Sequence, residues 1–217
     1  MKISILKTET ICFSPIFKLG AFLTLAMLAF AGFLRAESAP QAGLEGFIEA
    51  VRAMEFPVKD ADKHAESVGK ANGFIDLDSV GKKAMAVHWD KMTEAERQDF
   101  TNLFSKLIEA VAYRSSSSFF INAEVAYDTP VENESGASIN ARIRQKGEEL
   151  DAEVLFHLSE IDGAWKIDDV VLDGVSIVED LKYQFDKIIE TSSYPGLIQA
   201  MQERLAKETV ANQPGAA

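Results

Sequence analysis

The sequence WKIDDVVLDGVSIVEDLKYQFDKIIE, residues 165–190, decides the fold because within it a strand passes into a helix. Asp162-Gly163, just upstream, is a dipeptide typical of a tight hairpin turn, so this strand pairs with the one before it. Ser176 and Glu179 stand at the spacing of a capping box, in which each side chain bonds the backbone N–H of the other residue. We therefore predict that a helix begins near Ile177.

Upstream of this stretch, apolar residues recur at helical spacing. The pattern predicts helices over residues 44–55, 78–89 and 94–114. Thr93 and Glu96 form a second capping box at the start of the third of these helices. The serine run at residues 115–118 is expected to end that helix.

From Phe119 onward the period changes to two, which predicts strands over residues 119–125, 139–144 and 154–158 before the strand from Trp165. Pro195 is expected to begin a last helix. The order of elements predicts an α+β fold, with helices followed by a curved four-stranded antiparallel sheet and then C-terminal helices. Packed in this way, the elements enclose either a filled core or an apolar pocket, and composition alone does not separate the two.

The first 36 residues differ in kind from the rest. Three lysines precede an uncharged apolar run from Leu19 to Leu34, which is shorter than the roughly 20 residues that span a bilayer. We predict a secretory signal over 1–36 with cleavage after Ala36; cleavage after Ala31 and an uncleaved anchor are the alternatives. We further predict a linker over 37–43, one α+β domain over 44–207 and a flexible tail over 208–217.

Charge and cysteine content exclude several classes of protein. The chain has a formal net charge of −12, and the leader carries more basic than acidic residues, so the remainder is more acidic still. Such a surface repels nucleic acid, which we do not expect as a partner. Cys12 is the single cysteine and lies in the leader. The exported part therefore has no disulfide framework, cysteine nucleophile or thiolate metal site.

Titratable residues do not form a recognisable catalytic or metal-binding pattern. The three histidines, His64, His88 and His157, stand apart without the spacing of a zinc site. The aspartates near residue 170 lack the glycine-centred spacing of a calcium loop. We predict no catalytic residues and no metal. Asp169 is instead expected to accept hydrogen bonds from backbone N–H groups or a neighbouring hydroxyl.

Two blocks of sequence resemble the MlaC family, also called the toluene-tolerance family, of periplasmic phospholipid-binding proteins. The first is DSVGKKAMAVHW, residues 78–89, followed by TEAERQDF, residues 93–100, and Phe104. The second comprises WKIDDV from residue 165 and DGVSIV from residue 173, followed by Gln184-Phe185, Ile188-Ile189 and Gly196-Leu197-Ile198. The chain departs from the family pattern at Asp168 and at Asp180-Leu181-Lys182. Its helical tyrosine, Tyr113, falls one place later than the family's, which aligns with Ala112.

The resemblance implies a soluble carrier without enzymatic activity, exported to the periplasm. Such a carrier shuttles phospholipid between an outer-membrane lipoprotein complex and an inner-membrane ABC transporter complex, and so maintains outer-membrane lipid asymmetry. A bound phospholipid is then the cargo, held in an apolar pocket without any cofactor. The lipid-binding residues expected on the matched helices and strands are Phe100, Leu103, Phe104, Leu107, Val111, Val154, Phe156, Val170, Leu172, Phe185 and Ile189.

Two other functions remain open on the sequence. The first is an exported adaptor with a solid core, whose acidic surface binds a basic partner. The second is an enzyme on the same kind of cone-shaped fold, which requires His157 or His88 to lie beside an ionisable partner inside the cavity. The alternation of His157 with Val154, Phe156 and Leu158 predicts that this histidine faces away from their side of the sheet.

Overall fold

The computed structural model describes residues 40–147 and 152–211, without the side chains of 210 and 211. These residues belong to one compact unit, Ser38–Ala217. The predicted signal peptide, most of the predicted tail and the first part of the predicted linker lie outside the described residues. Helix α2 begins at Pro40 and α7 continues to Ala211. The domain bounds of 44 and 207 stay predictions.

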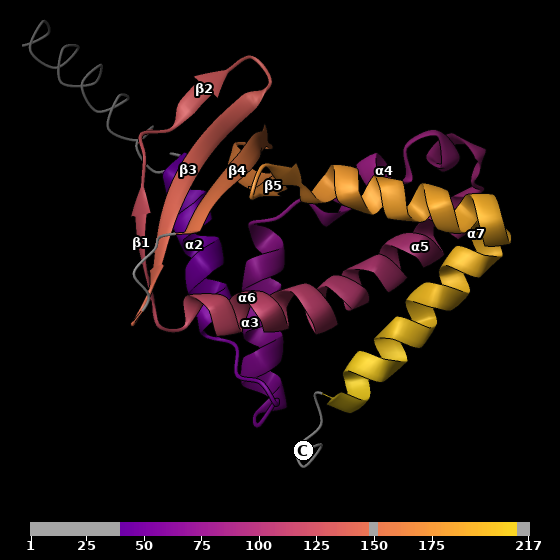
Figure 1. Ribbon diagram of the computed structural model, residues 1–217, viewed down its shortest axis with the longest axis horizontal. Coiled ribbons are helices and arrows are strands. Elements are labelled where there is room, and N and C mark those ends of the chain that lie inside the picture. The colour runs from indigo at the N-terminus through magenta and orange to yellow at the C-terminus, as the bar shows by residue number, and fades with distance from the viewer. Residues whose placement is uncertain (1–39, 148–151, 212–217) are drawn as a thin grey trace, which may run out of the picture. The chain divides into compact units, whose positions relative to one another are not determined.

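One antiparallel sheet carries the strands in the order β1-β3-β4-β5-β6, with β2 paired to β3. The long strands, β3 (Gly136–Gln145), β4 (Ala152–Ile161) and β5 (Ala164–Leu172), lie side by side, and β1 (Ala123–Tyr127) pairs with β3 (Figure 1). The α+β class and antiparallel pairing are confirmed. The predicted number of four strands is wrong, because β2 (Val131–Asn133) and β6 (Val175–Ser176) bring the sheet to six.

A second hairpin turn explains the extra strand β6. Asp173 and Gly174 both have positive φ, at 50° and 78°, as the favoured two-residue hairpin turn requires. The chain therefore folds back beside β5, pairing Leu172 with Val175, before the last helix begins. The strand predicted from Trp165 therefore ends at Leu172, and the chain reverses at Asp173-Gly174 before the helix.

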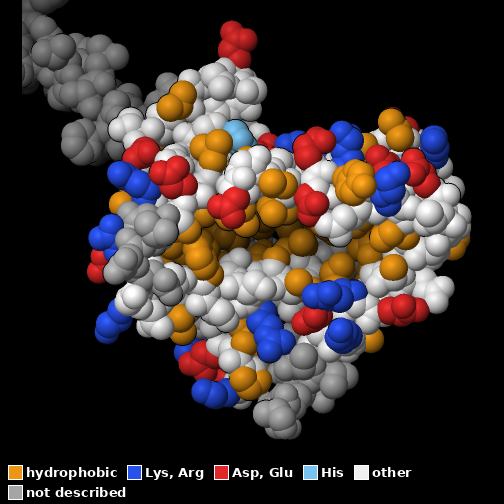
Figure 2. Space-filling view, in the orientation of Figure 1, with side chains coloured by type: hydrophobic (Ala, Val, Ile, Leu, Met, Phe, Trp, Pro, Cys, Tyr) orange, Lys and Arg blue, Asp and Glu red, His pale blue; other side chains and the backbone are white. Residues whose placement is uncertain are grey.

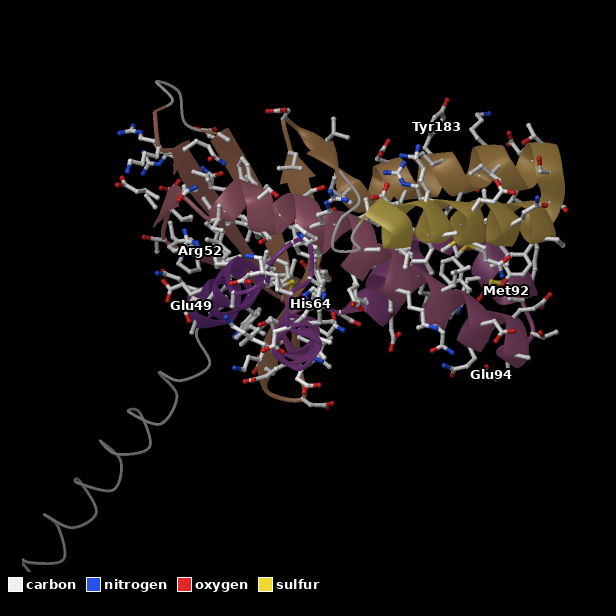
Figure 3. All side chains as sticks on the ribbon, turned by 90° about the horizontal axis from the view of Figure 1, so that it is seen from below. Glu49, Arg52, His64, Met92, Glu94 and Tyr183 are labelled. Carbon is white, nitrogen blue, oxygen red and sulfur yellow. The ribbon has the colours of Figure 1, made fainter. Side chains whose placement is uncertain are left out.

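The N-terminal helices pack beside the sheet. Helix α2 (Pro40–Arg52) contacts α3 (Ala61–Gly73) and also β5. Arg52, labelled in Figure 3, ties α2 to the start of the sheet: its guanidinium donates to the carbonyl oxygens of Phe120 at 3.0 Å and Ala123 at 2.6 Å.

A second group of helices extends away from the sheet. Helix α4 (Leu77–Met85) and the short 3₁₀ helix η2 (Ala86–Lys91) lead to a continuous helical rod. That rod comprises α5 (Glu94–Leu107), the π-helical segment η3 (Ile108–Tyr113) and α6 (Arg114–Phe120). In Figure 1 the rod and α7 (Ile177–Ala211) both run outward from the sheet, and α7 then turns back. The turn is at Ser193, whose φ of 63° breaks the helix just before Pro195.

Three sequence expectations about this region change. The rod ends at Phe120, not Arg114, so the serine run lies inside a helix and the first strand begins at Ala123. Ser117 is buried in the helix because its hydroxyl donates to the Met54 carbonyl oxygen at 2.8 Å. The helix predicted over residues 78–89 ends at Met85, where α4 gives way to η2, and Val87 on η2 is 66% exposed.

The buried apolar residues form two clusters. The first joins α2, α3 and the inner face of the sheet, with Ile139, Ile143 and Leu158 at its centre. The second joins α4, α5 and α7, with Phe100, Phe104 and Leu197 at its centre. Within the described residues, no helix combines the length and the apolar character needed to cross a bilayer.

Candidate functional site

A cavity of about 540 Å³ lies where the two apolar clusters meet. Its wall takes Phe47 and Phe156 from the first cluster and Val80 and Val178 from the second. Figure 2 shows hydrophobic side chains gathered in a hollow on the face that is seen in Figure 1. The volume falls within the range of about 300–1,000 Å³ that is usual for ligand pockets.

The sheet supplies the inner wall through alternation. In β4, Val154 and Phe156 are 2% exposed and face the cavity, while the strand's register pairs them with Leu172 and Val170 of β5. These two cross-strand pairs place four apolar side chains on one face. The face of β4 and β5 that carries these four side chains is therefore the one that points into the cavity.

Four of the eleven residues expected to bind lipid therefore line the cavity, namely Val154, Phe156, Val170 and Leu172. The other seven do not appear in its described wall. Phe100, Phe104 and Phe185 pack on one another in the second cluster, with ring centroids 5.7–6.4 Å apart. Leu103, Leu107 and Ile189 pack against the same cluster, and Val111 lies on η3 without reaching the cavity wall.

The rod contributes side chains that the sequence did not single out. Ile108, Ala112, Tyr113 and Phe119 line the cavity, whereas Leu107 and Val111 do not. Ile108 begins the π-helical turn, and Tyr113 and Phe119 come after its start. The turn closes its hydrogen bonds over five residues instead of four and so rotates the side chains that follow it. Helical spacing carried forward from Phe100 does not predict that change of face. The remaining apolar part of the wall comes from Ile75, Leu77, Phe120, Ile167, Ile177 and Leu181. Besides Tyr113, its polar members are Ser115, Ser116 and Asp169.

Asp169 is the only charged residue among the described members of the wall, and its carboxylate already has partners. It accepts the backbone N–H of Val170 at 2.8 Å and of Val178 at 3.1 Å, and the hydroxyl of Ser176 at 2.6 Å. Ser176 in turn accepts the backbone N–H of Glu179 at 3.1 Å. The predicted acceptor role of Asp169 and the predicted start of the helix at Ile177 are confirmed. Asp169 therefore holds the beginning of α7 against β5.

Tyr113 places a single hydroxyl in an otherwise apolar part of the wall. The residue is 1% exposed, and its hydroxyl donates to Oδ1 of Asn72 at 2.6 Å. Burial, with a further contribution from the Glu109 carboxylate, raises the pKa of Tyr113 well above its usual value. The phenol therefore stays protonated at physiological pH and acts as a donor.

The histidines lie outside the wall of this cavity. His157 contacts the Ser138 hydroxyl at 2.9 Å, on the face of the sheet opposite Val154 and Phe156, as its alternation predicts. His88 lies 2.7 Å from Asp186, between η2 and α7. Neither pair reaches the described wall, so the arrangement required for the enzyme is not present there. No group of three potential metal ligands occurs within residues 40–147 and 152–211.

A second depression, of about 730 Å³, runs along α5 and the C-terminal part of α7. Its wall carries Glu96, Asp99, Lys106 and several amides beside apolar residues, which include Leu103, one of the residues predicted to bind lipid. Burial and the two carboxylates raise the pKa of Tyr194, which lies in the same wall, to about 12. Because these charged side chains stand in its wall, the depression suits an apolar ligand less well than the 540 Å³ cavity.

Comparison with known proteins places the fold and the cavity in context. The family model described as MlaC protein matches residues 48–203. The chain belongs to the MlaC family. The resemblance carried by residues 78–104 and 165–198 is thereby confirmed.

Two relatives of this MlaC chain are informative. The intermembrane phospholipid transport system binding protein MlaC of Haemophilus influenzae is 24% identical over 144 residues, which cover 64% of this chain and 67% of that protein. A phospholipid-binding protein of Ralstonia solanacearum, solved in complex with a phospholipid, superposes with a TM-score of 0.62 at 18% identity. That match covers 78% of this chain and 96% of the other, and it shows that the two share a fold.

Proposed function

We propose that this protein is a periplasmic carrier that holds a phospholipid with its acyl chains in the 540 Å³ cavity. It passes the lipid between an outer-membrane complex and an inner-membrane ABC transporter, and so maintains outer-membrane lipid asymmetry. The observation that carries the proposal is the apolar cavity between the two clusters, in a chain of the MlaC family. The phospholipid bound to the Ralstonia solanacearum relative supports it.

The physical demand on a carrier matches the chemistry of the cavity wall. Each methylene group moved from water into an apolar site contributes about 0.8 kcal/mol, so a free phospholipid crosses an aqueous space only with its chains covered. Covering the chains needs apolar surface and no covalent chemistry. The hydroxyl of Tyr113 and the carboxylate of Asp169 are already hydrogen-bonded to the protein, which leaves the wall suited to hydrocarbon.

The acyl chains contact the paired side chains of β4 and β5 in this proposal. Val154, Phe156, Val170 and Leu172 form the sheet side of the site, and Ile108 and Phe119 form the helix side. Leu172 and Ile177 mark the mouth, since their side chains are 42% and 36% exposed while they also line the cavity. The headgroup then lies near the start of α7, outside the apolar wall.

Export and partner docking complete the proposal. The leader over residues 1–36 directs the chain to the periplasm and is removed there. The acidic surface disfavours adhesion to anionic lipid headgroups. The carrier therefore receives and delivers its lipid through partner proteins in the two membranes.

The test uses two neighbouring valines that face opposite sides of β5. Val170 lines the cavity, whereas Val171, paired with Leu155, does not. Val170→Trp fills the cavity and is expected to reduce the phospholipid bound after incubation with liposomes by about tenfold or more, equivalent to ~1.4 kcal/mol or more. Val171→Trp adds the same bulk on the other face and is expected to bind as the parent does.

Lipid phosphorus per protein, measured after separation from the liposomes, gives the readout, and circular dichroism verifies that both variants fold. Equal loading of the parent and Val170→Trp would show that lipid binds elsewhere or not at all.

A further inference from the structure

The deepest part of the cavity wall has one aromatic residue on the helix side. Four lining side chains are at most 2% exposed, namely Tyr113, Val154, Phe156 and Ile167. The last three belong to the sheet, and Tyr113 alone comes from the rod. Because Leu172 and Ile177 at the mouth are far more exposed, an acyl chain that enters there meets Tyr113 at depth.

Two contacts fix the ring of Tyr113. Its hydroxyl donates to Asn72 at 2.6 Å, and its ring makes a T-shaped contact with the ring of Phe47, with 6.1 Å between centroids. Asn72 is exposed near the end of α3, while Tyr113 itself lines the cavity. The tyrosine side chain therefore spans the wall from the cavity to the outer side of α3. A side chain held by both contacts cannot swing aside without losing a hydrogen bond.

We propose that Tyr113, anchored by Asn72, is the stop that limits the length of the acyl chain the cavity accepts. The inference rests on the proposed function, since it concerns the selectivity of the same site. A chain that reaches Tyr113 fills the apolar wall completely. A longer chain must leave methylene groups in water at the mouth, which disfavours binding in proportion to the number exposed.

The experiment measures which chain lengths the full-length exported protein retains. Parent and variants are incubated with liposomes containing equal amounts of phosphatidylcholines whose two saturated chains lengthen in even steps from lauroyl to arachidoyl. The protein is separated, and the bound lipids are identified by mass spectrometry. For the parent, we expect the amount of bound lipid to fall once the acyl chains exceed a certain length.

Tyr113→Ala removes the stop and is expected to move that limit upward by at least one step of the series. Ala112→Phe adds a ring to the wall beside Tyr113 and is expected to move the limit downward. Val171→Ala, on the opposite face of β5 and outside the cavity wall, is the control and leaves the limit unchanged. Asn72→Ala frees the tyrosine and broadens the distribution toward longer chains.

The possible outcomes distinguish an error in the assignment of Tyr113 from a failure of the proposed carrier function. If parent and variants retain lipid with the same length limit, the assignment of Tyr113 is wrong while the carrier function stands. If the parent retains no lipid of any length, the proposed function fails instead. Should Tyr113→Ala not fold, Ala112→Phe and Asn72→Ala still decide, because an unchanged limit in both overturns the proposal.

Discussion

At the residue scale, Asp169 joins the last long strand to the last helix. Its carboxylate gathers two backbone N–H groups and the Ser176 hydroxyl, so it caps α7 from a neighbouring strand. Ser176 supplies the cap expected from the sequence, while Glu179 pairs with Lys182 at 3.0 Å. The spacing of Ser176 and Glu179 predicted the helix start, and the added contribution of Asp169 depends on how β5 folds back.

Asp169→Ala leaves two backbone donors and a hydroxyl without their acceptor. We expect the free energy of unfolding to fall by about 1–3 kcal/mol, the range for an unsatisfied buried polar group. Asp169→Asn keeps an oxygen in the same place, so its free energy of unfolding is expected to fall clearly less. Urea denaturation followed by circular dichroism measures both. Equal stability of the alanine variant and the parent would show that these hydrogen bonds contribute nothing.

Glu96 gives a pH-dependent prediction at the same scale. The backbone N–H and hydroxyl of Thr93, at 2.7 and 2.8 Å, lower the pKa of Glu96 below its ordinary value of 4.5. A lowered pKa in the folded state means that the stabilisation is present above pH 4.5 and disappears as the pH falls through the folded value. Glu96→Gln is therefore expected to be less stable than the parent at neutral pH, with the difference shrinking in acid. A constant difference across this range would rule out the capping contribution of the carboxylate.

At the element scale, the π-helical turn η3 decides which side chains of the rod reach the cavity. The sequence predicted a regular helix, and regular spacing leads from Phe100 through Leu107 to Val111. The structure inserts the wider turn over Ile108–Tyr113 and so brings Tyr113, Ser117 and Phe120 to the buried face. Apolar periodicity carries no signal for such a turn.

Deleting single residues from the rod tests this account. Removing Ala110 from the π turn permits an ordinary helical turn there, because a π turn holds one residue more than an α turn between its bonded groups. We expect that variant to fold, with a loss of about 1–3 kcal/mol in unfolding free energy. Removing Ser105 from the regular part of α5 rotates all later side chains by about 100°. We expect that variant to lose its native fold by circular dichroism, and equal behaviour of the two deletions would contradict the account.

The strands show which elements the sequence can predict. Alternation identified β3, β4 and β5, since their inner faces are apolar over several residues. Strands β2 and β6 have three and two residues, too few for a period to be seen. They exist because neighbouring turns bring the chain back alongside a long strand. Short strands of this kind depend on tertiary pairing more than on local sequence.

At the scale of the whole described unit, the cavity exists because the apolar residues divide into two clusters. Phe100, Phe104 and Phe185 were expected to bind lipid, and the structure packs them together between α4, α5 and α7. A buried aromatic residue looks the same in sequence whether it fills a core or faces a cavity. Only the way in which the sheet packs against the second group of helices shows whether a given aromatic residue fills the core or faces the cavity. Family resemblance therefore predicted the fold, whereas which residues line the cavity depends on how the elements pack.

The most direct test of the carrier function is native mass spectrometry, combined with lipid extraction, on protein purified from a periplasm without detergent. The account predicts a mass increment equal to a phospholipid, bound in a fixed ratio and released on unfolding. An unliganded mass that persists after incubation with liposomes would contradict it.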